Sequence, residues 1–497
     1  MKKIKIIEYT VITMIGVCLY LPASAQTNSQ NYIKTTTYTN YANNNASDSL
    51  ITVQYFDGLG RPVETVQKGI TPAKADLIAF QEYDAFGRES NSWLPRVKAN
   101  NNGAFTAFND FKNLPKDIYL NDTAAYSKPV YEPSPLNRVL EQYGPGADWH
   151  KNGKAVKTDY YTNSSTYPCA YYYMSGDNLV RNNNYPDNQL YVTKATDEEG
   201  NISYEFKDKL GRVILQRQMN GSVKCDTYYI YDDFGNLRYV LPPLAANATG
   251  NGTYNENSTV IKDYAYVYKY NERNLCKWKQ LPGCDPVFYV YDKASRLIFT
   301  QDGEQRKTGL WLFSIPDDFG RIVLTGTCKN TLNHNNLLAD VVKATHPNNS
   351  YPTNTFKGYT ISGITPSNPV VLLVNYYDDY SFRSTNGIPN TSFDTSAGSD
   401  FNKQYTGGYK GLLTGTLTAV ISGNTAPTTY LYSIMFYDYR GQLIQSVSSN
   451  HLSGTVKEYF AYDFTGNLLR KKQIATPYGQ LLVFGGSSYP ANEINED

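Results

Sequence analysis

A short phrase of the type Tyr-Asp-x-x-Gly-Arg recurs along this 497-residue chain and constrains its fold more than any other feature. One early copy runs from Tyr83 to Arg88. Later, more degenerate copies begin at Tyr270 and Tyr291, which are 21 residues apart. A period of this length is the mark of a repeat architecture, in which each unit is one supersecondary element. We therefore expect a chain built from many similar short units.

The residues of the phrase predict a β-hairpin. A Tyr-rich segment such as Thr227–Tyr231 favours a strand that arrives at the Asp, whose carboxylate can accept hydrogen bonds from turn amides. The Gly supplies the positive φ that closes a bulged turn, and the segment Arg212–Gln216 shows the next strand beginning. The turn residues singled out in this way are Asp57, Gly60, Arg61, Asp84, Gly87, Arg88, Asp208, Gly211, Arg212, Asp232, Gly235, Asp292, Asp317, Gly320, Arg321, Asp438, Gly441, Asp463 and Gly466.

Stacked hairpins follow from the repeat, because a lone hairpin cannot bury its apolar face. We predict an all-β, mainly antiparallel fold, with the hairpins stacked into a curved, shell-like strip. The repeat tyrosines are expected to form a ladder of stacked rings with their hydroxyls toward water. A minor helical contribution is expected near the N-terminus, where residues 72–82, beginning with Pro72, are the best helical candidate.

Charge and composition exclude some partners. The net charge is +1, from 46 Lys and Arg against 45 Asp and Glu, which lacks the positive excess typical of a nucleic-acid-binding protein. The 46 tyrosines favour strands over helices. No nucleic-acid partner is expected.

The first 25 residues have the pattern of a signal peptide. Lys2, Lys3 and Lys5 precede an apolar run, and Ala23-Ser24-Ala25 fits a cleavage site. We expect cleavage after Ala25 and an exported protein in the periplasm, at the outer surface or secreted. Lipidation at Cys18 is a less favoured alternative, because the bulky Val17 precedes it. No later segment is long and apolar enough to predict a transmembrane anchor.

The Tyr-Asp-x-x-Gly-Arg phrase resembles the repeat of the YD-repeat, or Rhs-repeat, family, over about residues 38–473. The stretch Leu50–Pro62 resembles an uncharacterised domain that begins many secreted Rhs-type proteins of Gram-negative bacteria. The segments Lys410–Gly415 and Tyr432–Gln445 are similar to later parts of such chains. This resemblance implies a strip of sheet wound into a hollow shell, which encloses or presents a variable C-terminal domain, often a toxin.

The chain departs from that pattern near its end. After Gln473 we find neither the family's core segment nor an effector domain, and residues 474–497 read as a short tail. The expected partners are therefore a downstream Rhs core or effector polypeptide, with a surface glycan or a surface protein as the alternative.

Composition shifts divide the chain into segments. The expected boundaries are a signal peptide at 1–25, a polar leader at 26–50, an N-terminal Rhs-associated domain at 51–150, a repeat array at 151–330, an Asn-, Thr- and Pro-rich inserted region at 331–430, further repeats at 431–475 and a tail at 476–497.

We find no constellation of residues that predicts catalysis, a cofactor or a metal. The four histidines are scattered, no Ser lies in Gly-x-Ser-x-Gly, and the Gly-rich segment 407–411 lacks the Gly-Lys-Ser/Thr of a phosphate-binding loop. The acidic pairs at Asp232 and Asp317 are interpreted as turn caps. Asp378-Asp379 leaves weak calcium binding as a minor alternative.

Five cysteines remain after residue 25, and an odd number argues against a complete disulfide framework. Cys276 and Cys284 could pair across a hairpin connection, or all five could be buried small hydrophobic residues.

Two functions follow from these patterns. The favoured hypothesis is an exported, non-enzymatic shell segment or surface scaffold, as part of a toxin-encapsulating or interbacterial-competition system. The alternative is a cell-surface carbohydrate- or protein-binding module that uses exposed Tyr and Asn. An enzyme is the least favoured class.

Overall fold

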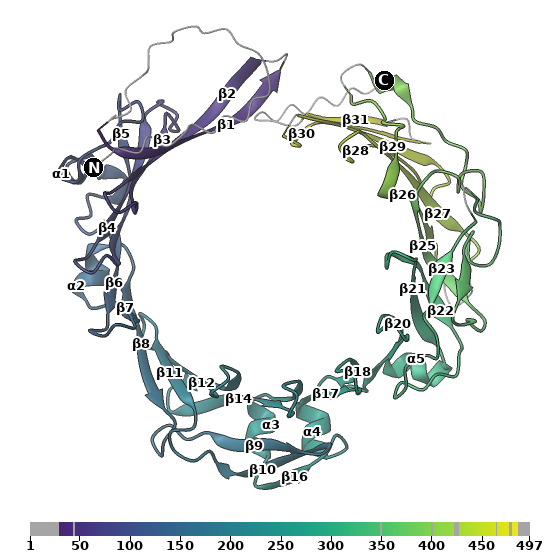
Figure 1. Ribbon diagram of the computed structural model, residues 1–497, viewed down its shortest axis with the longest axis horizontal. Helices are drawn as coiled ribbons and strands as arrows, with labels where there is room; N and C mark the ends of the chain where they lie inside the picture. The colour runs from purple at the N-terminus through teal and green to yellow at the C-terminus, as the bar shows by residue number, and fades with distance from the viewer. Residues whose placement is uncertain are drawn as a thin grey trace. The chain divides into compact units, whose positions relative to one another are not determined.

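The structure is a computed structural model that describes residues 29–42, 45–347, 350–398, 401–421, 427–463, 465–476 and 480–485 (Figure 1). The expected signal peptide and its cleavage site lie outside these residues. The chain divides into two compact units. Unit 1 is Met1–Tyr171 with Asn183–Tyr228, and unit 2 is Tyr172–Asn182 with Tyr229–Asp497.

Unit 1 is a run of antiparallel strands, each hydrogen-bonded to the next. Strand β8 pairs with β11 because the chain between them leaves the sheet. The strands are β1 (Asn31–Ala42), β2 (Asn45–Phe56), β3 (Pro62–Lys68), β4 (Asp76–Tyr83), β5 (Glu89–Lys98), β6 (Tyr126–Tyr131), β7 (Val139–Tyr143), β8 (Ala155–Thr162), β11 (Tyr191–Thr196), β12 (Ile202–Lys207), β13 (Val213–Asn220) and β14 (Val223–Tyr231), whose last residues fall in unit 2.

Unit 2 repeats the same antiparallel pattern. Its strands are β15 (Leu237–Leu241), β17 (Tyr266–Tyr270), β18 (Cys276–Gln280), β19 (Val287–Tyr291), β20 (Leu297–Gln301), β21 (Trp311–Pro316), β22 (Ile322–Cys328), β25 (Val370–Asp378), β26 (Tyr409–Ala419), β27 (Tyr430–Tyr437), β28 (Leu443–Ser449), β29 (Thr455–Tyr462), β30 (Leu468–Ala475) and β31 (Gln480–Gly485). Two small sheets accompany them, one of β9 (Ala170–Ser175), β10 (Asn178–Asn184) and β16 (Gly252–Tyr254), the other of β23 (Lys343–Thr345) and β24 (Thr360–Ser362).

Helices are short. Those in the described part are α1 (Phe108–Lys112), α2 (Ala147–Lys151), α3 (Pro243–Ala248), α4 (Thr259–Tyr264) and α5 (Gly303–Thr308), with single 3₁₀ turns at Asp117–Tyr119 and Thr395–Ala397. Across the described residues, no helix is long and apolar enough to cross a membrane. The all-β, mainly antiparallel class with minor helix near the N-terminus is confirmed. The curvature of the strip stays a prediction.

One local prediction was wrong. The helical candidate at 72–82 is a turn followed by β4, in which Asp76, Ile78 and Phe80 are buried and the residues between them are only partly buried. That period of two places alternate side chains on opposite faces of a sheet, as a strand requires. The polar leader at 26–50 contains β1 and the start of β2. The tail contains β31, which pairs with β30.

The core of unit 1 lies between its sheet and the long connection from β5 to β6. Tyr55, Val66 and Ile78 of three neighbouring strands are buried against Phe111 of α1. The connection therefore acts as a second layer, which buries a sheet face that a single layer would leave in water.

The core of unit 2 is built in the same way from the inserted region at 331–408. Strand β23 packs against β21 of the sheet (Figure 1). Ala344 of β23, Tyr351 and Phe382 are buried in one cluster with Phe313 and Tyr376 of the sheet strands. The insertion therefore covers a face of the sheet and forms part of the core of unit 2.

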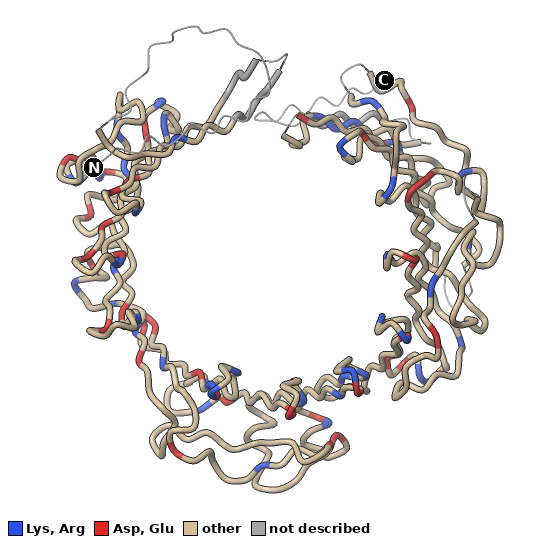
Figure 2. The backbone as a smooth tube through the Cα atoms, viewed as in Figure 1, with Lys and Arg blue, Asp and Glu red and all other residues tan. Residues whose placement is uncertain are grey.

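Charged residues of both signs are interspersed along the backbone of each unit (Figure 2). Many of them lie in the hairpin turns, where acids and bases of the same turn form ion pairs.

Candidate functional site

The repeat turn is the feature that recurs most often, and Asp57 illustrates it. The Asp57 Oδ1 accepts hydrogen bonds from the amides of Leu59, at 2.8 Å, and Arg61, at 3.0 Å. The Gly60 amide donates to the Asp57 carbonyl at 3.1 Å, and Gly60 has a φ of 81°. The strand register shifts between Tyr55 and Phe56, which is the predicted bulge. The Arg61 amide bond holds the pKa of Asp57 below its ordinary value.

The same arrangement recurs at every predicted turn. The acids that accept both amide bonds are Asp84, Asp208, Asp232, Asp292, Asp317, Asp438 and Asp463. The glycines at positive φ are Gly87, Gly211, Gly235, Gly320, Gly441 and Gly466. In the two degenerate copies, Asn274 and Ser295 take this conformation instead.

The repeat arginine completes the turn. In four turns its Nε donates to the second carboxylate oxygen of the Asp at 2.7 Å, and these arginines are Arg61, Arg88, Arg212 and Arg321. Asn236 and Asn467 make the corresponding bond with a side-chain amide where the Arg is missing. In these six turns both carboxylate oxygens therefore accept hydrogen bonds from their own turn.

The repeat arginine also contacts the next hairpin. This contact was not predicted from the sequence. The guanidinium carbon of Arg61 lies 4.4 Å from the ring centre of Tyr83, and that of Arg88 lies 4.4 Å from the ring centre of Tyr131. Cation–π contacts of this kind join a turn to the tyrosine that precedes the following turn.

The tyrosine hydroxyls were predicted to face water, and this was wrong. Tyr83 donates to the carbonyl of Pro62 at 2.9 Å, and Tyr131 donates to the carbonyl of Glu89 at 2.9 Å. Each acceptor is the first residue after the preceding turn. The same bond is made by Tyr270 to Leu237, by Tyr291 to Cys276 and by Tyr462 to Leu443. Burial raises the pKa of Tyr270 and of Tyr291 to about 12, so both stay protonated donors near neutral pH.

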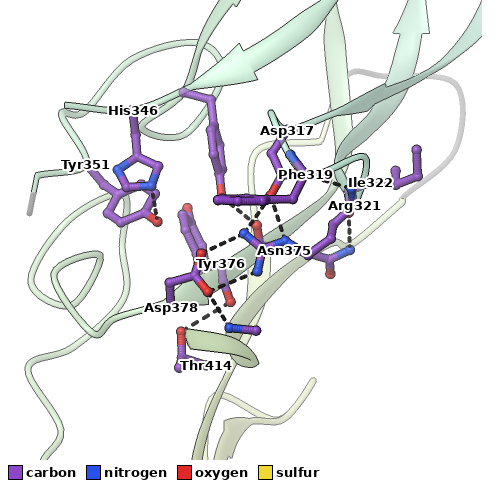
Figure 3. A network of polar contacts seen from close by, with 12 residues as sticks. Asp317, Phe319, Arg321, Ile322, His346, Tyr351, Asn375, Tyr376, Asp378 and Thr414 are labelled. Carbon is purple, nitrogen blue, oxygen red and sulfur yellow. Dashed lines mark hydrogen bonds and ion pairs between the residues drawn. The ribbon is translucent and has the colours of Figure 1, made fainter. Parts of the chain in front are cut away.

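The turn at Asp317 lies beside a cavity of about 220 Å³ in unit 2. Arg321 occupies its polar side, and both terminal guanidinium nitrogens donate to the carboxylate of Asp378, at 2.9 and 2.6 Å (Figure 3). Nη2 also lies 2.6 Å from the carboxylate of Asp317. Hydrogen bonds from Arg321 lower the pKa of Asp378, and hydrogen bonds to Asp378 raise that of Arg321.

Asp378 also has strained backbone, with a φ of 75° in a residue other than Gly. Its carboxylate accepts a further bond, at 2.6 Å, from the amide of Gly411. Such conformations persist where the surroundings fix them. Arg321 and Gly411 supply those surroundings here.

Aromatic rings form the other side of the cavity. His346 stacks on Tyr351 with ring centres 4.1 Å apart, and its Nε2 lies 2.9 Å from the Tyr351 hydroxyl. Tyr359, Tyr377 and the exposed Phe319 also line it. The arrangement offers stacking surfaces beside charged groups that are already paired. It suits binding of a small polar molecule better than proton transfer.

Calcium binding at Asp378-Asp379 is not supported. Asp378 is paired with Arg321, and Asp379 Oδ1 accepts bonds from the amide and the hydroxyl of Ser381. Within the described ranges, no group of three or more His, Cys, Asp or Glu could hold a metal ion.

The cysteines and the remaining histidines show no shared site. All five described cysteines are free, so Cys276 and Cys284 do not pair. Cys169 and Cys328 are buried, as small hydrophobic residues would be, but Cys284 is exposed. His334 stacks on Phe288 with ring centres 3.8 Å apart.

Two further turns of this type that begin with an acidic residue were not predicted from the sequence. Asp197 accepts the amides of Glu199 and Asn201, and Gly200 has a φ of 92°. Its signal, Asp-x-x-Gly-Asn without the Tyr, could have been found. Glu132 and Arg138 form a longer version of the turn, with their side chains 2.6 Å apart. Two additional residues between the acid and the arginine make this turn differ from the repeat phrase.

Comparison with known proteins gives one family match. Residues 20–162 match a family model described as a domain of unknown function, DUF6443. An uncharacterised domain near the N-terminus is therefore confirmed. The search of curated proteins found no match.

Comparison with solved structures finds similarity to two toxin-complex structures. One is described as the crystal structure of TcdB2-TccC3 without the hypervariable C-terminal region, with 11% identity, a TM-score of 0.42 and coverage of 88% of this chain. The other is a Tc holotoxin pore from Photorhabdus luminescens, with 13% identity, a TM-score of 0.37 and coverage of 92%. The match covers 19% and 22% of those chains, so this chain spans about a fifth of their length.

Proposed function

We propose that the chain is an exported, non-catalytic scaffold of the Rhs or YD-repeat type. Its strip of hairpins would form part of a shell that encloses or presents a partner polypeptide. The observation that carries this proposal is the repeat turn, because its Asp, Arg and Tyr bind the turn itself or the neighbouring hairpin.

A catalytic site needs polar groups that are free to meet a substrate. In the turns at Asp57 and Asp84 both carboxylate oxygens already accept hydrogen bonds, and the arginine of each turn lies against the next tyrosine. The charged residues of these turns therefore bind to groups within the strip. This supports a structural role.

The proposed partner is a core or effector polypeptide encoded downstream, as the Rhs resemblance implies. The Lys-rich start and the cleavage pattern ending at Ala25 support export together with that partner.

Co-expression with the product of the directly downstream reading frame tests the proposal. We expect the two chains to purify together and the partner to resist a protease that degrades it when it is expressed alone. Separate elution with unchanged protease sensitivity would contradict a shell role. A Tyr83→Phe variant loses one hydrogen bond between neighbouring hairpins of unit 1. Weaker protection of the partner by this variant would show that protection depends on an intact strip.

The cavity beside Arg321 favours a second candidate function, binding of a saccharide. Sugars stack their apolar faces on aromatic rings, and Phe319 offers an exposed ring at this cavity. A glycan array would test it with Phe319→Ala. The matched control is Phe234→Ala, because Phe234 holds the same turn position and is equally exposed. Specific signals lost with Phe319→Ala and retained with Phe234→Ala would support this function, and an array without specific signals would exclude it.

A further inference from the structure

The cavity beside Arg321 lies where a repeat turn has been opened. Tyr377 and Asp378 stand in the place of the Tyr-Asp of a repeat phrase, and the guanidinium carbon of Arg321 lies 4.3 Å from the ring centre of Tyr377, as in the contacts between other turns. A long connection to β26 follows Asp378 instead of a tight turn. The cavity is lined partly by these residues and partly by the inserted region, so the repeat alone does not create it.

The volume of the cavity limits the size of its ligand. About 220 Å³ is less than the roughly 300–1,000 Å³ of pockets that enclose drug-sized molecules. One sugar ring therefore fits, and the rest of a longer saccharide would extend into solvent.

Aromatic rings supply stacking surfaces in this cavity. Phe319 is 81% exposed, and Tyr351, Tyr359 and Tyr377 line the cavity with it. Figure 3 shows His346 and Tyr351 across the site from Phe319. The faces of such rings carry partial negative charge, so they attract a cationic group as well as the apolar face of a sugar.

Carboxylates outnumber cations around the cavity. Asp317, Asp318 and Asp378 line it, and Arg321 is the basic residue among the lining side chains. Lys343 pairs with Asp318 at 2.6 Å from outside the lining. With the histidine neutral, three carboxylates against two cations leave one negative charge. A lining of this sign favours a cationic ligand over an anionic one.

The hydrogen bonds of these groups point to the same class of ligand. Arg321 donates to the carboxylates of both Asp317 and Asp378, so it is already neutralised and cannot select an acidic sugar. Asp318 is more open, with a side chain that is 53% exposed. Its Oδ1 accepts a bond from Lys343, and among the described residues its Oδ2 has no hydrogen-bond partner. An ammonium group of a ligand can donate to that oxygen.

The chain contains a second turn of the same sequence without the cavity. The Asp-Asp-Phe-Gly of residues 317–320 recurs at residues 232–235. Phe234 is 82% exposed, close to the value for Phe319, but residues 232–235 do not line the cavity. This turn therefore offers the same side chains without the aromatic wall of the inserted region.

We propose that the cavity binds a saccharide unit that carries a protonated amine, with the apolar face of the sugar on Phe319 and the ammonium group at Asp318. The inference rests on the saccharide-binding function proposed above and names the class of sugar. Neutral sugars lack the ion pair with Asp318, and acidic sugars meet a lining of their own charge.

Isothermal titration of the full chain near neutral pH tests the proposal with two matched ligands, a trisaccharide of glucosamine and its fully N-acetylated form. We expect the amine form to bind at least about tenfold more tightly, because it adds one charge-assisted hydrogen bond. Asp318→Asn should remove this preference, and Phe319→Ala should weaken the binding of both ligands. Asp233→Asn and Phe234→Ala are the matched controls and should bind as the wild type does.

Each other outcome contradicts a different part of the proposal. Equal affinity for the two trisaccharides, or a preference that persists in Asp318→Asn, would overturn the amine specificity and leave saccharide binding in place. Absence of binding to either trisaccharide and to a glycan array would overturn both. A lysine tripeptide that binds as tightly as the glucosamine trisaccharide, with the same dependence on Asp318 and Phe319, would assign the cavity to a basic peptide and overturn the saccharide.

Discussion

At the scale of single residues, the turn glycine should contribute to the free energy of unfolding only because its backbone has a positive φ. A Cβ at Gly60 would meet no atom within 4 Å, and the same holds for Gly58 in the same turn. Only Gly60 has positive φ, at 81°. We expect Gly60→Ala to lower the free energy of unfolding by about 1–2 kcal/mol, since a left-handed conformation costs that much with a Cβ. Gly58→Ala should change it little. Equal effects in urea unfolding would contradict this account.

The tyrosine hydroxyl offers a second test at this scale. Tyr83→Phe keeps the ring beside Arg61 and removes the bond to the Pro62 carbonyl. We expect a loss of about 1 kcal/mol, the usual net value of one hydrogen bond. The control is Tyr191→Phe, because Tyr191 is 61% exposed. Urea midpoints measured on both variants decide the matter, and an unchanged midpoint for Tyr83→Phe would show that the bond adds no stability.

The sequence predicted the contacts within a turn but not those between turns. Asp57 and Gly60 are three residues apart, so local geometry was enough to assign both. Tyr83 meets Pro62 only because β3 pairs with β4 in one particular register. Register depends on the pairing of segments distant in sequence, which the repeat phrase alone does not determine.

At the scale of elements, the connection from β5 to β6 is anchored to its sheet by a buried acid. Both carboxylate oxygens of Glu64, on β3, accept the amide of Thr106, at 3.1 and 3.0 Å, and Glu64 is 1% exposed. Burial raises the pKa of Glu64 from 4.5 to about 7. The folded state therefore holds the proton more tightly than the unfolded state does.

The sign of the pH dependence follows from that shift. The contribution of Glu64 to stability is fully present below about pH 4.5 and is lost as the pH rises through 7. Two to three pH units correspond to about 3 kcal/mol. We expect the unfolding midpoint to fall between pH 5 and about 8, and Glu64→Gln to remove that part of the fall. Identical pH profiles of wild type and variant would contradict the assignment.

Strands were predictable where the repeat phrase marks them, and covering segments were not. The segment that became β4 was misread because its Pro and Ala residues favour a helix start, whereas burial against β3 and β5 selects the strand. The insertion that buries Tyr351 and Phe382 in the core of unit 2 has no repeat phrase. Its role depends on a sheet face that only the assembled hairpins create.

At the scale of the whole molecule, the remaining prediction concerns curvature. Neighbouring strands in a sheet twist in one hand, by roughly 20–25° for each pair. Every pairing of the long strand runs in both units is antiparallel, so the twist should accumulate in one sense along each run. We therefore expect a curved strip with open edges, because flat sheets of this length are unusual.

Small-angle scattering of the monomer would test that expectation. A curved, open strip keeps solvent on both faces wherever no insertion covers it, so its pair-distance distribution should be broad and skewed to long distances. The scattering should be measured at several protein concentrations, because association of the chain would distort the curve. A symmetric distribution typical of a solid sphere would show that the hairpins fold back on themselves. In that case the open strip would be wrong.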